Sequence, residues 1–208
     1  MSPQEESYNL IITGVGGQGN VLASQLVGQA LVSKGYFVTI GETYGASQRG
    51  GPVMSHIRIS NKKQRSPLIP QGKSHIIMSM EPVEALRVIA PYGNPDAVAL
   101  VNTRSIYPIE VTAGDEFYPD LEEIKAALDQ LCKKVYYINA VEKAVELGSP
   151  IMSNMIMLGA LLDLEILPLS IKEFSETLSR NLTGDRLDIN LKAIQEGRKA
   201  VHKEECYE

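Results

Sequence analysis

The sequence predicts an α/β protein in which helices cover both faces of a mainly parallel sheet. Short runs of β-type residues alternate with segments of helical periodicity through most of the chain. Two glycine-rich loops, at 14–19 and 44–51, each follow an apolar β-type run, and the end of the chain has helical patterns only. We therefore expect one domain, 1–208, with a Rossmann-like three-layer sheet core at 1–150 and a helical C-terminal part at 151–208.

The first third of the chain has the pattern of a β-α-β unit followed by a third strand. Residues 8–13 form an apolar strand, residues 20–33 have an apolar helical face, and Gly35 ends that helix as a left-handed cap. A second strand follows at 36–43, and crossovers of this kind are right-handed. Residues 52–60 alternate apolar and polar side chains, and the short connection predicts antiparallel pairing with strand 36–43 at or near an edge.

The middle of the chain alternates polar connections with further strands and one helix. Residues 61–73 are polar and contain two prolines, which predicts a loop. After it we expect a strand at 75–80, a helix at 82–89 with Pro82 at its first position, and a turn at 91–95. These are followed by a strand at 97–102 and an irregular stretch at 103–119, which includes a candidate edge strand at 109–111.

The last elements are mostly helical. We expect a helix at 121–131 capped by Asp120, a strand at 135–139 and a short helix at 140–147. Three longer helices are expected at 153–164, 170–180 and 187–203. The segment 153–164 is apolar nearly all round. It therefore predicts a helix that is buried on several sides or packed against a partner.

Composition narrows the functional classes. The chain has 208 residues, 44% of them apolar, and a formal net charge of −5, so nothing favours a nucleic-acid partner or an acidic membrane. Its two cysteines, Cys132 and Cys206, lack metal-ligand spacing, and free thiols suit a reducing cytosol. The acidic N-terminus is unlike a signal peptide, and no run approaches the roughly 20 apolar residues of a membrane span. We expect a soluble, cytoplasmic protein.

The first glycine loop has the arrangement of an anion-binding turn between a strand and a helix. Glycines let main-chain N–H groups approach an anion, and the helix dipole favours negative charge there. Gly14, Gly16 and Gly19 have the G-x-G-x-x-G spacing of dinucleotide folds, and Glu42 ends the second strand where a ribose-binding acid would lie. One alternative is therefore an NAD- or FAD-dependent oxidoreductase.

The second glycine loop changes this interpretation. It places a cation, Arg49, beside Gln48 and two glycines, and a simple dinucleotide domain does not need one. Two strands of a parallel sheet would bring both loops to the same edge, where ligands of open α/β folds bind. In a purely structural alternative, the two loops bind no ligand: the glycines only permit tight turns, and Arg49 forms an ordinary ion pair.

Taken together, the two loops resemble those of a known family. The segments Gly14-Val-Gly-Gly-Gln-Gly19 and Tyr44-Gly-Ala-Ser-Gln-Arg-Gly-Gly51, followed by Val53-Met-Ser-His56, are similar to the gamma domain of the 2-oxoacid:ferredoxin oxidoreductases. Ser153-Asn154 and the helix after it resemble a later motif of that family. The likeness covers essentially the whole chain and is greatest to the small subunit of the indolepyruvate branch.

The resemblance implies a role inside a larger enzyme. Such enzymes decarboxylate a 2-oxo acid on thiamine diphosphate with Mg, pass electrons through 4Fe-4S clusters to ferredoxin, and transfer the acyl group to coenzyme A. These cofactors are expected in a large partner subunit. The chain itself is expected to hold no tightly bound cofactor, to be inactive alone, and to help form the coenzyme A side of the site. We also expect that the chain, when isolated from its partner subunit, can form a homodimer through the interface that is then exposed.

No catalytic residue and no metal ligand are expected in this chain. The expected binding residues are Gly14, Gly16, Gly17, Gln18, Gly19, Gln48, Arg49, Gly50, Gly51 and Asn154. Asn154 starts an apolar helix, where its amide would either cap main-chain groups or reach a partner. His56 on the third strand is more readily explained as a structural histidine than as a general base. A nucleotide-binding module of the E1 type shares Gly-x-Gly-Gly-x-Gly, but the paired Cys-x-x-Cys motifs of most such proteins are absent from the sequence.

Overall fold

A six-stranded mixed sheet forms the centre of the molecule. The computed structural model describes residues 7–45, 51–107, 111 and 117–204. The strands lie in the order β2-β3-β1-β4-β5-β6. Their bounds are β1 Ser7–Val15, β2 Phe37–Tyr44, β3 Pro52–Ser60, β4 Ile76–Ser79, β5 Val98–Asn102 and β6 Lys134–Ile138. Strands β1, β4, β5 and β6 are mutually parallel, and β3 is antiparallel to both of its neighbours. The predicted α/β fold with a mainly parallel sheet is confirmed.

Strand β3 separates the two strands of the predicted β-α-β unit. It pairs with β1 on one side and with β2 on the other, so β2 is the edge strand of the sheet. The short connection after β2 leaves the chain no room for a crossover, and the next strand must therefore return antiparallel. Because β1 and β2 both run opposite to β3, they point the same way, and Gly14 and Tyr44 lie on either side of Val53.

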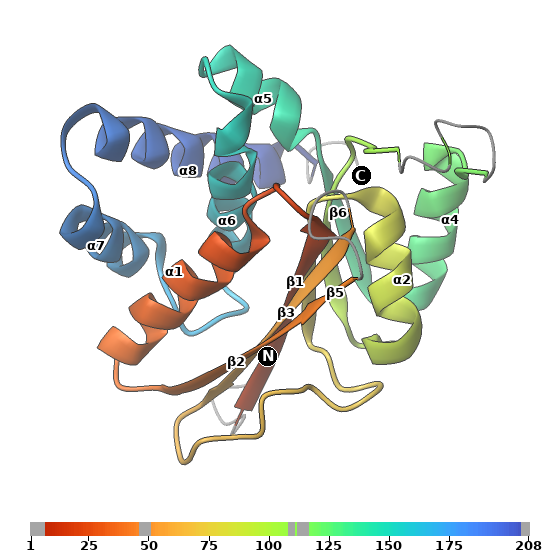
Figure 1. Ribbon diagram of the computed structural model, residues 1–208, viewed down its shortest axis with the longest axis horizontal. Coiled ribbons are helices and arrows are strands. Elements are labelled where there is room, and N and C mark those ends of the chain that lie inside the picture. Colours follow the sequence, from red (N-terminus) through yellow and green to blue (C-terminus); the bar gives the residue numbers. More distant parts are fainter. Residues whose placement is uncertain (1–6, 46–50, 108–110, 112–116, 205–208) are drawn as a thin grey trace.

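Helices cover both faces of the sheet, as Figure 1 shows with β2 nearest the viewer. Helix α1 (Asn20–Ser33) and the C-terminal helices lie on one face, and α2 (Pro82–Tyr92) and α4 (Leu121–Leu131) lie on the other. The alternation of side chains along β1 explains this arrangement: Leu10 and Ile12 enter the core under α1, and Ile11 enters the core under α2. All three are fully buried, and each contributes about 2–3 kcal/mol of transfer free energy.

The C-terminal helices pack directly on the sheet and on one another. They are α5 (Ala140–Glu146), a short 3-10 turn at Pro150–Met152, α6 (Ser153–Asp163), α7 (Ile171–Asn181) and α8 (Gly184–Glu204). Every residue of α6 from Ser153 to Leu162 is buried, as its apolar sequence predicted. Helices α6 and α8 approach so closely that a side chain at Gly159 or Gly197 would collide with the main chain of the other helix.

In two connecting segments, the structure differs from the prediction made from the sequence or shows a feature that was not predicted. Helix α2 continues through Pro91 to Tyr92, where a turn was expected, because a proline in the last turn costs only one hydrogen bond. The loop at 61–73 is polar as predicted, but it also covers the sheet, since a side chain at Gly41 would collide with Pro67. The candidate edge strand at 109–111 lies largely outside the described residues. Within the described ranges, no helix is long and apolar enough to cross a membrane.

Candidate functional site

The two glycine loops meet at the carboxyl edge of the sheet. The main-chain N–H of Gly16 donates to the oxygen of Gly51 at 2.9 Å, and that of Gly45 donates to the oxygen of Pro52 at 2.8 Å. These bonds close the base of the second loop beside the first. Gln48, Arg49 and Gly50 lie outside the described residues. Gly51 is buried where the second loop rejoins β3.

The first loop turns sharply between β1 and α1. Gly17 and Gly19 have φ angles of 101° and 82°, in the left-handed region that favours glycine. Gly14 still belongs to β1, and a side chain there would meet Gln18, Met80 and Asn20. These glycines are therefore required by the turn itself, whatever ligand it binds.

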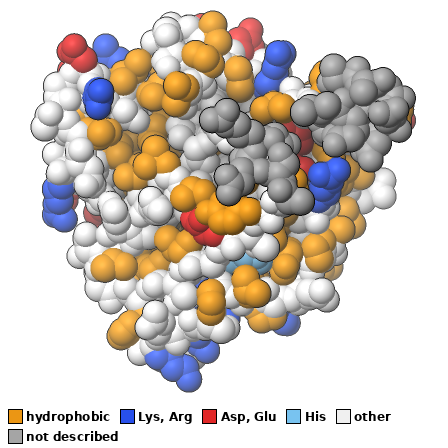
Figure 2. All heavy atoms as spheres, in the orientation of Figure 1, with side chains coloured by type: hydrophobic (Ala, Val, Ile, Leu, Met, Phe, Trp, Pro, Cys, Tyr) orange, Lys and Arg blue, Asp and Glu red, His pale blue; other side chains and the backbone are white. Residues whose placement is uncertain are grey.

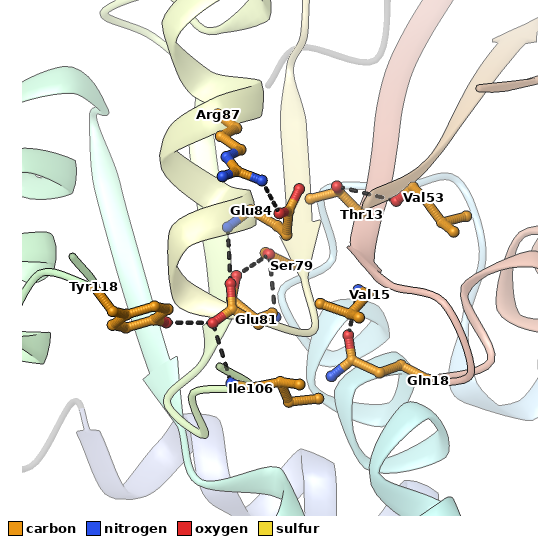
Figure 3. Close-up of polar contacts among 10 residues, drawn as sticks. All are labelled: Thr13, Val15, Gln18, Val53, Ser79, Glu81, Glu84, Arg87, Ile106 and Tyr118. Atoms are coloured by element: carbon orange, nitrogen blue, oxygen red, sulfur yellow. Dashed lines mark hydrogen bonds and ion pairs between the residues drawn. The ribbon is translucent and has the colours of Figure 1, made fainter. Parts of the chain in front are cut away.

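The side chain of Gln18 folds back into the protein. Its Oε1 accepts from the N–H of Val15 at 2.6 Å, as Figure 3 shows, and its Nε2 donates to the oxygen of Met80 at 2.8 Å. The amide thus joins the loop to the end of β4. Both of its polar atoms are engaged within the protein, so Gln18 supports the loop rather than offering a free group to a ligand.

A cavity of about 620 Å³ opens over the first loop and the end of β2. Its described lining consists of Gly16, Gly17, Gly19, Asn20, Val21, Tyr44, Gly45 and Val53. Tyr44 is 56% exposed, and its hydroxyl donates to the carboxylate of Glu42, which raises the tyrosine pKa. Asn154 lies beneath the cavity: its side-chain nitrogen occupies the place that a side chain at Gly19 would take.

A cluster of buried carboxylates lies beyond the other side of β1, and sequence reasoning assigned it no role. Glu81 is 1% exposed; its Oε2 accepts from the N–H of Glu84 at 2.9 Å and so caps α2. Its Oε1 accepts from the N–H of Ile106 at 3.3 Å and from the hydroxyl of Tyr118. Figure 3 shows these partners converging on Glu81 from separate parts of the chain. The only signal in the sequence is an acid directly before the proline that begins α2.

Glu84 extends this cluster toward a second cavity. Its carboxylate pairs with Arg87 at 2.8 Å, and burial raises its pKa, opposed by Arg87. The cavity, of about 290 Å³, lies between α2 and the β2–β3 hairpin and is mostly apolar, with Met54 and Tyr92 among its lining. In the view of Figure 2, hydrophobic side chains are spread over the visible surface, whereas Lys and Arg side chains lie around its margin.

The remaining candidate groups have structural surroundings. His56 is fully buried, its Nδ1 accepts from the N–H of Ile69 at 3.4 Å, and burial lowers its pKa. It therefore stays neutral near pH 7 and holds the 61–73 loop on the sheet. Burial raises the pKa of the Cys132 thiol to about 11, so it is unreactive near neutrality. Cys206 lies outside the described residues. Within the described part of the chain, no three His, Cys, Asp or Glu side chains are grouped as metal ligands.

The topology argues against the dinucleotide alternative. In a dinucleotide fold the ribose-binding acid ends the strand next to β1. Here β3 takes that position, and Glu42 lies one strand further away, with its carboxylate bound to Tyr44. The glycine spacing therefore matches that of dinucleotide folds, but the acidic residue that would bind the ribose lies on the wrong strand.

Comparison with known proteins gives the chain its class. The family model described as pyruvate ferredoxin/flavodoxin oxidoreductase matches residues 9–200. The indolepyruvate oxidoreductase subunit IorB of Archaeoglobus fulgidus is 37% identical over 189 residues, which cover 91% of this chain and 92% of the relative. The subunit of the same name from Pyrococcus horikoshii is 38% identical over 197 residues, which cover 94% and 96%.

Solved structures share the fold. A 2-oxoglutarate:ferredoxin oxidoreductase from Magnetococcus marinus superposes with a TM-score of 0.73 at 22% identity, over 96% of this chain and 32% of that longer one. The pyruvate oxidoreductase subunit PORC of Thermotoga maritima superposes with a TM-score of 0.69 at 19% identity, over 94% and 97% of the two chains. At these identities the likeness establishes the fold alone.

The fold and the matched relatives define a subunit of a multi-subunit 2-oxoacid:ferredoxin oxidoreductase. Within that class, the chain belongs to the pyruvate ferredoxin/flavodoxin oxidoreductase family. The resemblance drawn from the two glycine loops is confirmed.

Proposed function

We propose that this chain is the non-catalytic small subunit of a 2-oxoacid:ferredoxin oxidoreductase that acts on an aryl 2-oxo acid such as indolepyruvate. The choice of substrate rests on relatives of 36–38% identity that carry the indolepyruvate name. In this proposal residues 1–208 act as one domain. The large partner subunit holds thiamine diphosphate with Mg and the 4Fe-4S clusters, and it passes electrons to ferredoxin.

The observation that carries the proposal is the meeting of the two glycine loops. The Gly16–Gly51 hydrogen bond brings the described ends of the second loop to the rim of the cavity over the first loop, and Arg49 lies between those ends in the sequence. A guanidinium binds phosphate or carboxylate in a fork of two hydrogen bonds, and glycine N–H groups bind phosphate. We propose that this rim forms the coenzyme A side of the assembled active site and helps to cover it.

Arg49→Ala in the reconstituted complex tests the role of the rim. The expected result is a rise of about tenfold or more in the KM for coenzyme A with the large subunit still bound, because a charge-assisted contact contributes about 1.5–3 kcal/mol. Lys63→Ala is the matched control, since Lys63 is an exposed cation in the loop at the opposite end of the sheet. Unchanged coenzyme A affinity and turnover in Arg49→Ala would exclude this role for Arg49.

Purification from the native host tests the partner and the substrate. The tagged chain is expected to bring down a large subunit with the absorbance of iron–sulfur clusters and with thiamine diphosphate. That complex is expected to reduce ferredoxin with indolepyruvate faster than with pyruvate. A chain that purifies alone with a bound dinucleotide would overturn the proposal in favour of the dinucleotide alternative.

A further inference from the structure

Strand β2 has a free edge. It is the outermost strand of the sheet, and no described strand pairs with its outer side. The N–H of Gly45 donates to the oxygen of Pro52, and this bond shows which main-chain groups face β3. In an antiparallel ladder every second residue bonds to the neighbouring strand, so the odd-numbered residues of β2 bond to β3 and the even-numbered residues face outward. These outward residues are Val38, Ile40, Glu42 and Tyr44.

Strand β2 lacks the features that usually protect an exposed edge. It has eight residues and pairs with β3 without a bulge. It contains no lysine and no proline, and its one charged residue is Glu42. Natural proteins place such features on edge strands because an unprotected edge pairs with other strands. We therefore expect the free edge of β2 to be covered.

Helix α1 presents an uncharged surface beside this edge. It has no charged residue from Asn20 to Ser33. Leu22 and Val32 are 50% and 57% exposed. Figure 2 has the orientation of Figure 1 and looks onto the β2 edge, where hydrophobic side chains are spread over the visible surface and Lys and Arg lie around its margin. Protein interfaces are likewise depleted of charge at their centres. The exposed side of the helix, called the α1 stripe below, consists of Leu22, Gln25, Gln29 and Val32.

A groove of about 510 Å³ connects the edge to the α1 stripe. Val38 and Ile40 line it from β2, and Arg180 lines it from α7. Gly28 of α1 also lines it and lies against the Ile40 side chain. Arg180 is exposed and forms no ion pair with any described residue. The groove therefore combines an apolar floor with a cation that has no counter-charge in the described part of the chain.

One pairing of β2 with a second copy of itself satisfies all of its outward groups. A two-fold axis at Gly41 places Val38 opposite Tyr44 and Ile40 opposite Glu42. Each such pair exchanges two hydrogen bonds, so about eight main-chain bonds form. An axis at Glu42 would set two like charges directly opposite each other, which is destabilising. An axis at Ile40 would leave Tyr44 without an opposite residue in β2.

The same register fills the groove. The side chains of Val38 and Ile40 lie on the α1 face of the sheet, against Gly28, and directly opposite residues share a face. Tyr44 of the second copy therefore lies beside Val38, and an aromatic ring next to a β-branched side chain is a favourable pair. Glu42 of the second copy lies beside Ile40, in the groove that Arg180 lines. Its carboxylate supplies the counter-charge that Arg180 lacks.

The helices above the edge fit the same symmetry. A two-fold axis that relates two antiparallel strands of one sheet is perpendicular to that sheet, so both α1 helices lie on the same face of the joined sheet. The two helices then run antiparallel to each other. Leu22 of one α1 stripe faces toward Val32 of the other, and no charge is buried between them.

We propose that two copies of this chain pair antiparallel along β2, about a two-fold axis at Gly41, and so join their six-stranded sheets into one. The inference goes beyond the proposed function and does not depend on it. The self-complementary register and the match between Glu42 and Arg180 favour a second copy of the chain over a different protein as the occupant of this edge.

Amide hydrogen exchange of the full chain tests the pairing residue by residue. The amides of Ile40 and Glu42 are expected to exchange at least tenfold more slowly at high than at low protein concentration, because they bond only to the second copy. Those of Thr39, Gly41 and Thr43 are expected to be protected at both concentrations, because they bond to β3. Sedimentation measures the dimer fraction in parallel. A chain that stays monomeric up to millimolar concentration, or a dimer with unprotected Ile40 and Glu42, would overturn the proposal.

A proline at position 42 tests the strand edge. Glu42→Pro removes an outward N–H and leaves the β2–β3 ladder intact, since proline is tolerated on the open side of an edge strand. Glu42→Ala is the matched control, because it loses the same carboxylate but keeps the N–H. The dissociation constant of the dimer is expected to be at least about tenfold higher for Glu42→Pro than for Glu42→Ala. Equal dimerisation by the two variants would contradict pairing along β2.

A charge exchange tests the register without altering the strand. Arg180→Glu brings like charges together in the groove and is expected to weaken the dimer several-fold. Addition of Glu42→Arg to that variant reverses both charges and is expected to restore the dimer. Lys172→Glu, the same change at an exposed site near the start of α7, is the control and is expected to have no effect. A double variant that dimerises no better than Arg180→Glu alone would overturn the proposal.

The large subunit is the other candidate for this edge. The protection of Ile40 and Glu42 is expected in the isolated chain and is expected to persist in the assembled complex, with two copies of this chain in each complex. Protection that appears only when the large subunit is added to a monomeric chain would assign the edge to the large subunit and reject the second copy.

Discussion

The side-chain amide of Gln18 donates to the main-chain oxygen of Met80 at 2.8 Å, and this bond ties the first glycine loop to the end of β4. The same oxygen accepts from Nδ2 of Asn102 at 2.9 Å, and Oδ1 of Asn102 accepts from the N–H of Ala140 at 3.0 Å. Side chains from β5 and the glycine loop thus share one acceptor. The carboxyl edge is held by polar contacts beneath the surface on which a ligand would rest.

Replacement of Gln18 by methionine is expected to lower the free energy of unfolding by about 2 kcal/mol. The side chain keeps its length, but the buried N–H of Val15 and the oxygen of Met80 each lose a partner. Urea denaturation measures the loss, and Gln25→Met on the exposed side of α1 is the control. Equal stability of both variants would show that the Gln18 amide does not hold the loop.

Tyr118→Phe is expected to cost about 1–2 kcal/mol near pH 8, because the Glu81 carboxylate loses a hydroxyl donor. Burial raises the pKa of Tyr118 well above its usual value near 10, and Glu81 raises it further. A raised folded pKa means that the stability present below pH 10 falls as the unfolded tyrosine ionises above it.

The wild type is therefore expected to lose more unfolding free energy than Tyr118→Phe between pH 8 and about pH 11. Denaturant unfolding at several pH values measures this difference. A constant difference between the two proteins across that range would contradict a shifted Tyr118.

Glu173 is expected to make stability sensitive to acid. Its carboxylate accepts from Lys34 at 2.8 Å and from Ser170, and these contacts lower its pKa to about 2. A lowered folded pKa gives stability that is present above the unfolded pKa, near 4.5, and is lost as the pH falls toward 2. The Glu173 side chain is 35% exposed, so water screens the pair and its contribution is less than about 1 kcal/mol.

In Glu173→Gln this part of the pH dependence is expected to disappear. Unfolding free energies measured from pH 5 down to about pH 2.5 are expected to converge with those of the wild type. Glu176→Gln, a neighbouring carboxylate on α7, is the control. Parallel curves for the wild type and Glu173→Gln would argue against the ion pair.

Gly159→Ala is expected to destabilise the protein by more than about 3 kcal/mol, since the added methyl meets the main chain of α8 at Ile194, which cannot move aside as a side chain does. Gly28→Ala is the matched control in α1. The methyl there would collide only with the end of the Ile40 side chain, and alanine favours the helix by about 1 kcal/mol. Thermal unfolding of both variants measures the contrast, and similar losses would show that α6 and α8 are able to separate at little cost.

Much of the fold follows from local pattern. The alternation along β1, the apolar character of α6 and the glycine loops could be predicted, because each depends on residues that are close together in the sequence. The position of β3 between β1 and β2 could not be predicted, since strand order depends on which strands pair in the folded protein. The buried Glu81 cluster could not be predicted either, because Ile106 and Tyr118 reach it from far along the chain.

The sequence by itself determined the α/β class, the family likeness and the two loops, because strand and helix periods and glycine turns are local properties. Only the tertiary structure decided that the starts of α1 and α6 meet, and that two buried amides lie where they meet. The physical reason is that the effect of a helix dipole or of an unpaired hydrogen-bonding group depends on which groups lie near it in space. Asn154 is 135 residues from Gly19 in the chain and against it in the fold.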